Sequence, residues 1–357
     1  MCICAVFTLS YGDNSIIADD RQNENDNKMV QKSWDYSKIA FIAQITKNQE
    51  WSLCIMDSSG NNMHKIIETT IVCQTPVRSN FGTQLLFMAH TGGGIYGMYS
   101  VNTDGSGLNL IDRGHIGYAT WSPDDKYIAY IKYPDHSWSS SKIILYNTSN
   151  KTSKVLNVTG KVKDYPNFSP NGQQIVYSAT LPSDTIFMDS LRNYHIYKVD
   201  IDGKNNHLII NEALHPQWSP LGDKILYLST GINGSFQISV ANADGSNQQQ
   251  LTSSVSPIWR DGNKDPHWTP DGQKIVYVSW ENDKPEIFIM NADGSNKMCL
   301  TKEGVQNTNP TITPDGQYIL FSSVRSGTRN NGICMMDLDG NNQCILYFTG
   351  IYPMVCK

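Results

Sequence analysis

The chain has 357 residues, and its 28 Lys and Arg residues nearly balance its 33 Asp and Glu residues, for a net charge of −5. No run of basic residues occurs, which argues against nucleic-acid binding and against attachment to an anionic membrane surface. No segment approaches the ~20 apolar residues of a membrane-spanning helix, so no membrane span is expected.

The N-terminal part divides into an apolar and a polar segment. Residues 1–10 are apolar but lack the positively charged start of a signal peptide. Two readings fit them: the remnant of a signal that begins upstream, or a strand. Residues 12–28 are polar and show no core-forming pattern, which predicts a solvated linker. We therefore assign residues 1–29 to an N-terminal tail and expect an exported protein, periplasmic, cell-surface or extracellular.

A ten-residue phrase recurs five times in the rest of the chain. Each copy has an apolar anchor, then Ser or Thr, then Pro and a turn residue pair such as Asp-Gly, and then an apolar run. The anchors are Trp121, Phe168, Trp218, Trp268 and Ile312, and they lie 47, 50, 50 and 44 residues apart. Self-similarity at this period predicts a repeat array.

Each copy predicts two strands joined by a tight turn, because Pro fixes φ and Gly adopts positive φ. About 25 residues later, a second signature predicts a hairpin around an Asp-Gly turn. This hairpin recurs at Gly105, Gly203, Gly245, Gly294 and Gly340, with weaker versions at 57–60 and 147–150. Weaker forms of the first strand pair lie at 34–41 and 77–87. Each unit therefore has four antiparallel strands, the size of one propeller blade.

The predicted fold class is all-β: a single β-propeller over residues 30–350, with seven four-stranded blades, or six if the first unit is half formed. The expected blades are about 30–71, 72–113, 114–159, 160–211, 212–253, 260–302 and 306–348, followed by a C-terminal tail at 351–357. Two modes of ring closure stay open. Residues 351–356 return to the first blade, or residues 3–9 complete the last one. Pro353 would restrict the former strand to an edge.

The two joined signatures resemble the TolB-type β-propeller repeat, which is WD40-like and also called PD40. The resemblance covers about residues 30–347. It implies a fold and leaves function open, since the family includes periplasmic adaptors, propeller domains of serine peptidases, some lyases and many surface proteins. Periplasmic TolB proteins also carry a separate α/β domain before a six-bladed propeller. Nothing before residue 30 is long enough for that domain, so we do not expect an ordinary TolB.

The innermost strand of each blade lines the channel of a propeller, and ligands usually bind there. On an alternating strand, the positions one and three before the anchor face the same side. They are all polar or Tyr, as a water-filled channel alone would require. From this set the candidate ligand-binding residues are Tyr165, His215, Asp265, His267 and Asn309.

Three of these residues carry groups that could converge on a cation or an acidic substrate: His215, Asp265 and His267. Oligogalacturonate lyases of similar repeat type use channel histidines with a metal, but a third such histidine is missing here. We therefore predict no metal and no other cofactor; if a metal binds, these three residues are its expected ligands.

Two further sets of residues carry expectations. The anchors Trp121, Trp218 and Trp268 should pack between blades, whereas Trp138, Trp259 and Trp280 lie in or near loops and are candidates for a recognition surface. Cys334 and Cys344 flank the last Asp-Gly turn, so a cross-strand disulfide is conceivable.

The favoured function is a non-catalytic binding scaffold for a protein partner or a cell-envelope polymer. No nucleophile elbow, dinucleotide-binding phrase or Walker phrase occurs in the sequence. The alternatives are a carbohydrate-active enzyme in the channel, either a polysaccharide lyase or a hydrolase, and a structural module of a surface array.

Overall fold

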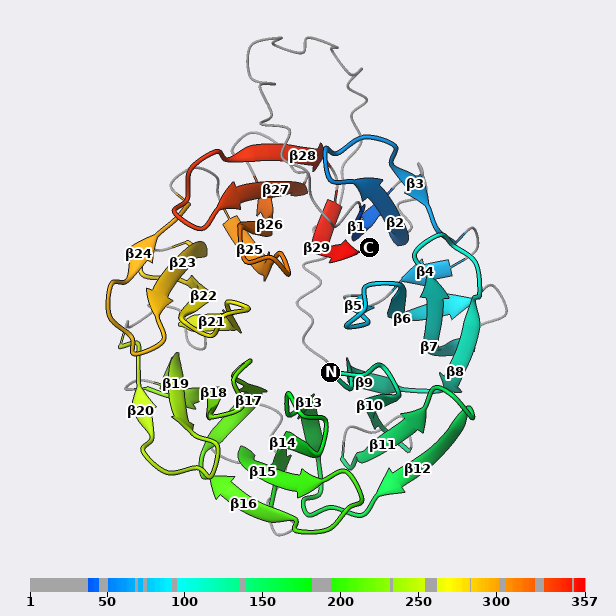
Figure 1. Cartoon of the computed structure of the whole chain (residues 1–357), viewed down its shortest axis with the longest axis vertical. Helices are drawn as coiled ribbons and strands as arrows, with labels where there is room; N and C mark the ends of the chain where they lie inside the picture. The colour runs from blue at the N-terminus through cyan, green and yellow to red at the C-terminus, as the bar shows by residue number, and fades with distance from the viewer. Residues whose placement is uncertain are drawn as a thin grey trace.

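Seven antiparallel sheets surround a central channel, so the predicted all-β, seven-bladed propeller is confirmed (Figure 1). The computed structural model describes residues 38–44, 51–67, 70–72, 76–91, 95–134, 139–181, 194–231, 234–253, 262–282, 284–301, 306–324, 331–348 and 350–356. These residues contain no helix that is long and apolar enough to cross a membrane.

The first three blades contain strands of uneven length. Blade 1 contains β29 (Gly350–Cys356), β1 (Lys38–Gln44), β2 (Trp51–Asp57) and β3 (His64–Lys65). Blade 2 contains β4 (Thr70–Val72), β5 (Val77–Arg78), β6 (Gln84–Thr91), β7 (Ile95–Asn102) and β8 (Asn109–Arg113), with β4 and β5 both paired to β6. Blade 3 contains β9 (Ile116–Trp121), β10 (Tyr127–Lys132), β11 (Lys142–Asn147) and β12 (Thr152–Leu156).

The last four blades follow the repeat phrase closely. Blade 4 contains β13 (Lys163–Phe168), β14 (Gln174–Thr180), β15 (Tyr194–Asp200) and β16 (His207–Ile210). Blade 5 contains β17 (Ala213–Trp218), β18 (Lys224–Thr230), β19 (Phe236–Asn242) and β20 (Gln249–Gln250). Blade 6 contains β21 (Asn263–Trp268), β22 (Lys274–Ser279), β23 (Glu286–Asn291) and β24 (Met298–Cys299). Blade 7 contains β25 (Gln306–Ile312), β26 (Tyr318–Val324), β27 (Asn331–Asp337) and β28 (Cys344–Phe348).

The C-terminal strand closes the ring. β29 pairs antiparallel with β1, from Lys38 opposite Cys356 to Ala43 opposite Gly350. The expected tail at 351–357 is thus a strand over most of its length, and the alternative in which it returns to the first blade is correct. Pro353 lies on this innermost strand, where the missing N–H interrupts no second ladder. The expected tail at 1–29, including residues 3–9, lies outside the described residues.

The repeat phrase is explained by the hydrogen bonds of its turn, as blade 6 illustrates. Thr269 Oγ1 donates to Asp271 Oδ1 (2.6 Å) and accepts from the backbone N–H of Lys274 (2.9 Å). The N–H of Gly272 donates to the carbonyl of Thr269 (2.8 Å), with a φ of 70° at Gly272. Only glycine adopts that backbone region at little cost. The residue types of the phrase are therefore those that this turn requires.

The anchors pack between blades, as expected. Trp121 is 5% exposed and lies in a cluster with Leu86 and Met88 of blade 2 and Ile128 of its own blade. Its indole N–H donates to the carbonyl of Val77 on blade 2 (3.4 Å). Burial of one large apolar side chain in such a cluster stabilises the fold by about 1.5–3 kcal/mol. The ring is thus stabilised by contacts between neighbouring blades as well as within each sheet.

The conceivable disulfide between Cys334 and Cys344 does not form, and both thiols are free. Cys344 lies opposite Met335, whereas Cys334 lies opposite Ile345. A shift of one position directs two side chains to opposite faces of a sheet. The register of β27 and β28 therefore prevents the bridge.

Candidate functional site in the central channel

Four of the predicted site residues occupy the same unusual backbone position. The innermost strands β13, β17, β21 and β25 each contain a bulge two to three residues before the anchor. The first residue of each bulge has a left-handed backbone conformation, with φ of 50° at Tyr165, 58° at His215, 47° at Asp265 and 55° at Asn309. Each such non-glycine residue costs ~1–2 kcal/mol, which the surrounding blade must offset.

This bulge corrects one step of the sequence interpretation. We expected regular alternation, which would direct the positions one and three before the anchor to the same side. The bulge inserts an extra residue and interrupts the alternation. A signal for it was present, because Pro follows the left-handed residue in all four strands, at 166, 216, 266 and 310. Pro has no N–H for a ladder and is found in strands mainly at edges and bulges.

Three consecutive blades bring their aromatic rings together at the channel. The ring centroid of Tyr165 lies 3.9 Å from that of Tyr118 and 4.0 Å from that of His215. Tyr165 Oη donates to Tyr118 Oη (2.9 Å). The backbone N–H of His215 donates to Ser178 Oγ (3.0 Å), which ties the stack to blade 4. Tyr118 remains 43% exposed, so an ordered aromatic surface faces solvent.

His215, Asp265 and His267, predicted to converge, are close enough to affect one another's charge. Burial lowers the pKa of His215 to about 3, and repulsion from His267 acts in the same direction. Burial raises the pKa of the Asp265 carboxyl, against the attraction of His267 and Lys264. Burial lowers the pKa of His267, and Asp265 opposes this shift. His215 is therefore a neutral imidazole at physiological pH, able to stack and to exchange hydrogen bonds.

The sequence interpretation missed a carboxyl group beside the aromatic stack. Asp164 directly precedes Tyr165 on β13, and its Oδ1 accepts the backbone N–H of Tyr165 (3.1 Å). Burial raises the pKa of Asp164 to about 7, and this hydrogen bond only partly opposes the rise. The position was missed because the equivalent residues of blades 5, 6 and 7 are Leu214, Lys264 and Thr308, so no pattern marked it.

The remaining predicted residues make local hydrogen bonds or lie outside the described residues. Asn309 Oδ1 accepts a hydrogen bond from Thr308 Oγ1 (3.0 Å) on β25. Trp280 follows β22 and is only partly exposed, and its backbone N–H donates to the carbonyl of Gly262 (3.3 Å). Trp138 and Trp259 lie outside the described residues, so the recognition surface stays a prediction.

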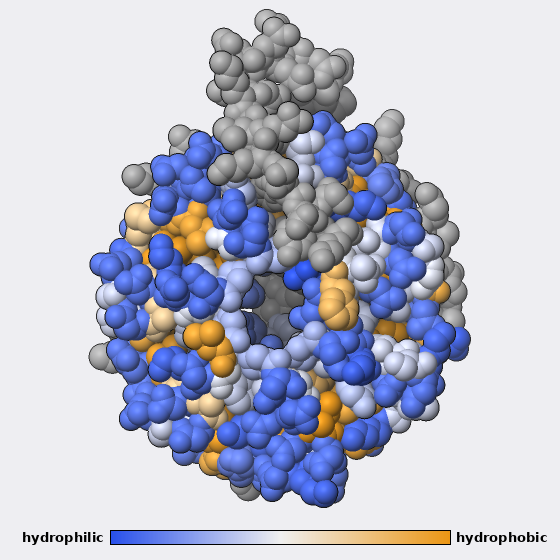
Figure 2. All heavy atoms as spheres, viewed as in Figure 1, coloured by the Kyte–Doolittle hydropathy of each residue, from blue (hydrophilic) through white to orange (hydrophobic). Residues whose placement is uncertain are grey.

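The channel opening on the face seen in Figure 2 is bordered mainly by hydrophilic residues. Within the described part of the chain, no three His, Cys, Asp or Glu side chains lie close enough together to hold a metal ion. The conditional ligand set of His215, Asp265 and His267 does not have that arrangement. The innermost strands of blades 3, 4 and 5 instead bring together the tilted rings of Tyr118, Tyr165 and His215.

Fold and channel together define a seven-bladed propeller with an aromatic site on its innermost strands. The family model described as TolB beta propeller domain (PD40) matches residues 185–355. Residues 185–355 therefore carry repeats of the TolB-type β-propeller family, as the sequence predicted.

Similar proteins support this assignment. The Tol-Pal system protein TolB of Francisella tularensis subsp. mediasiatica is 26% identical over 261 residues, which cover 70% of this chain and 55% of that protein. In the curated relatives compared, the matched part spans only 24% to 55% of their own length. The crystal structure of TolB from Acinetobacter baumannii matches 89% of this chain and 82% of that chain, with a TM-score of 0.55 and 18% identity. Oligogalacturonate lyase from Vibrio parahaemolyticus matches 88% of this chain and 85% of that chain, with a TM-score of 0.62 and 14% identity. At these identities, the structural matches show a shared fold alone.

Proposed function

We propose that the protein is a non-catalytic binding scaffold that engages a protein partner at its channel, with Tyr118 as the main contact. The observation that carries this proposal is the exposed Tyr118 ring, which is in tilted contact with the Tyr165 ring and accepts a hydrogen bond from its hydroxyl group. A preorganised aromatic side chain loses little conformational entropy on binding, and such residues dominate protein interfaces.

The relatives support a partner in the cell envelope. Those compared are named Tol-Pal system protein, and an exported location also agrees with the apolar start and polar linker of the sequence. We therefore propose that this chain acts in the periplasm or at the cell surface. A cell-envelope polymer is the second occupant that the polar channel would accept.

Site-specific crosslinking distinguishes a scaffold that binds a partner at its channel from a structural module that packs into a surface array. A photoreactive amino acid replaces Tyr118 in one variant and Leu208 in the other, and each is expressed in the producing cells. Leu208 is 40% exposed on β16, the outermost strand of blade 4. We expect one defined adduct from position 118 and none from position 208. Adducts between copies of the chain at position 208 would instead support the array, and the absence of any adduct at position 118 would refute the scaffold.

A lyase acting in the channel is the second candidate, because His215, Asp265 and His267 influence one another there. Its test is incubation with oligogalacturonate and Mn²⁺ while the absorbance of an unsaturated product is followed. Activity that is lost on combined His215→Ala and His267→Ala substitution would replace the scaffold with an enzyme. We expect no product and no bound metal after purification.

A further inference from the structure

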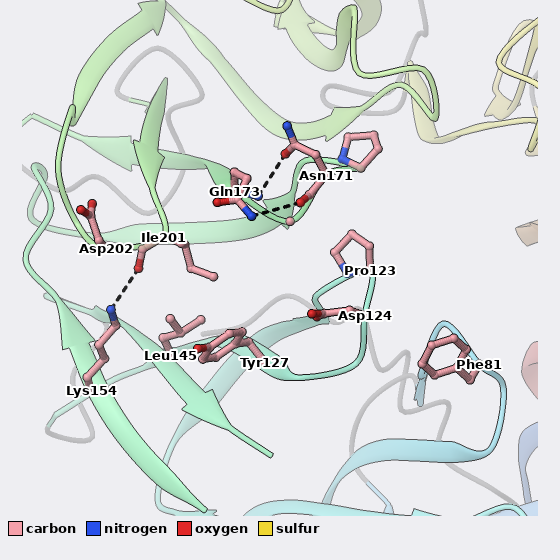
Figure 3. Close-up of a pocket in the computed structure, with 12 residues that line it drawn as sticks. Phe81, Pro123, Asp124, Tyr127, Leu145, Lys154, Asn171, Gln173, Ile201 and Asp202 are labelled. Atoms are coloured by element: carbon pink, nitrogen blue, oxygen red, sulfur yellow. Dashed lines mark hydrogen bonds between the residues drawn. The ribbon is translucent and has the colours of Figure 1, made fainter. Parts of the chain in front are cut away.

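A groove lies between blades 3 and 4, on the face that carries the turns after β9, β13 and β15. Its volume is about 660 Å³, within the ~300–1,000 Å³ of small-ligand pockets. Figure 3 shows Phe81 at one end and Lys154 and Asp202 at the other. The floor and walls are formed by apolar side chains and amides: Pro123, Tyr127, Leu145, Pro170, Asn171, Gln173 and Ile201.

Phe81 departs from the residue type found at its turn position in four of the other blades, whereas blade 5 also has an apolar residue there, Leu221. In blades 3, 4, 6 and 7 its position holds Asp124, Asn171, Asp271 and Asp315, whose side-chain oxygens accept the hydroxyl hydrogen of the preceding Ser or Thr. Blade 2 has a phenyl ring there instead, which is 59% exposed. The exchange removes a turn-stabilising bond and exposes apolar surface.

A second departure in the neighbouring turn holds Phe81 in place. Blade 3 has Asp125 where the other turns have Gly, with a left-handed φ of 55°. Its carboxylate accepts the backbone N–H of Asn80 (2.7 Å) and that of Phe81 (3.0 Å). The strain of a non-glycine residue at this φ is offset by two charge-assisted bonds between blades. The exposed ring is thus carried on a clamped turn at the edge of the groove.

The charges around the groove cancel locally. Asp124 Oδ2 lies 3.0 Å from Lys126 Nζ, and Asp202 Oδ2 lies 3.0 Å from Lys204 Nζ. Lys154 Nζ donates to the carbonyl of Ile201 (3.0 Å). Hydrogen bonds from Lys204, and to a lesser extent attraction by the charge of Lys154, lower the pKa of the Asp202 carboxyl. The groove therefore offers hydrogen-bonding groups and apolar faces without a strong field of either sign. A ligand that combines hydroxyl groups with apolar ring faces and has no charge fits this surface.

We propose that the groove between blades 3 and 4 is a binding site for a neutral oligosaccharide, with a pyranose ring packed against Phe81. Asn171, Gln173, Asp124 and Lys154 supply the hydrogen bonds to its hydroxyl groups. This site is separate from the channel and does not depend on the proposed scaffold function.

The test titrates the full chain with neutral chito-, cello- and malto-oligosaccharides and measures binding by calorimetry. We expect saturable binding of at least one series, and Phe81→Ala should weaken it about tenfold, the size of a strong aromatic contact. Leu221→Ala is the matched control, because Leu221 occupies the same turn position in blade 5 and is 73% exposed. It should leave binding unchanged. Asp125→Gly restores the common turn residue but removes the clamp, and should weaken binding without unfolding the chain.

Four results would overturn the proposal: no saturable binding in any series at millimolar concentration, equal effects of Phe81→Ala and Leu221→Ala, tighter binding of oligogalacturonate than of neutral sugars, or binding of a Pro-rich peptide alone. Tighter binding of oligogalacturonate would show that the groove prefers an acidic sugar, although its charges are paired. The last would assign the groove to a protein segment. Circular dichroism of each variant keeps a folding defect distinguishable from lost binding.

Discussion

Asp164 should make the propeller less stable as the pH rises towards neutrality. Its carboxyl is only partly exposed, and burial raises its pKa from the ordinary 3.8 to about 7. Between pH 3.8 and about pH 7, the folded chain keeps a proton on Asp164 that the unfolded chain has released. Stability therefore falls from about pH 4 to about pH 7 and levels off above it. The substitution Asp164→Asn removes the buried charge and should remove this dependence.

The size of the effect follows from the two pKa values. At 1.36 kcal/mol per pH unit, the interval between 3.8 and about 7 corresponds to about 4 kcal/mol. Water in the channel stabilises part of the charge of a partly exposed carboxylate, so we expect about 2 kcal/mol above pH 7. The Asp164→Asn variant should be more stable than the parent by this amount at pH 8 and about equal to it at pH 4.

Urea unfolding, followed by tryptophan fluorescence from about pH 4 to pH 8, measures the difference. The matched control is Asp271→Asn, because Asn171 already occupies the same turn position in blade 4. Hydrogen bonds from Thr269 and Gln273 lower the pKa of Asp271. Its contribution is therefore present above pH 4 and lost as the pH falls through its folded pKa, and the control should show no gain at pH 8. Parallel pH profiles for the parent and the Asp164→Asn variant would refute the reasoning.

Three further predictions concern stability. A Cβ at Gly245, whose φ is 86°, would overlap the carbonyl of Ile209, so Gly245→Ala should cost about 2–3 kcal/mol in urea unfolding; Gly114→Ala, with open space around a φ of 102°, should cost only about 1 kcal/mol. Deletion of residues 350–357 removes the inner strand of blade 1 and should abolish cooperative thermal unfolding, with recovery on addition of a peptide of residues 350–356. Tyr165→Phe removes the hydroxyl bond to Tyr118 and should lower stability by about 1 kcal/mol with the ring stack retained, as near-ultraviolet circular dichroism would show.

The fold could be predicted from the sequence because each blade repeats the same local chemistry. The Ser/Thr-Pro-Asp-Gly turn satisfies its own hydrogen bonds within six residues, as Thr269 to Lys274 shows, so a short phrase determines it. The apolar runs that follow are buried in every blade, as in β10 and β22. Such information is local, and local information is what one sequence shows most clearly.

Features that depend on distant partners were less accessible. The sequence left open whether residues 351–356 return to the first blade, since pairing between residues so far apart in the chain leaves no local mark. The phase of β28 against β27 decides that Cys334 and Cys344 cannot meet, and it is set by how the intervening turn joins the two strands. In the channel, His215, Asp265 and His267 were predicted to converge. The contacts of Tyr118 with Tyr165 and His215 could not be predicted, because they depend on how blades 3, 4 and 5 are placed relative to one another.

Departures from the repeat are more informative about function than the repeat itself. Asp or Asn at the tip of the turn and Gly after it satisfy the turn at little cost, although blade 5 has Leu221 at the tip. Phe81 and Asp125 break both preferences in adjacent blades, and the second residue holds the first in place through two hydrogen bonds. What separates Phe81 from Leu221, which is also apolar and exposed at the turn tip, is this clamp and its position beside a groove. The combination of a clamped, exposed ring and an adjoining groove is therefore the reason for placing the proposed ligand site between blades 3 and 4.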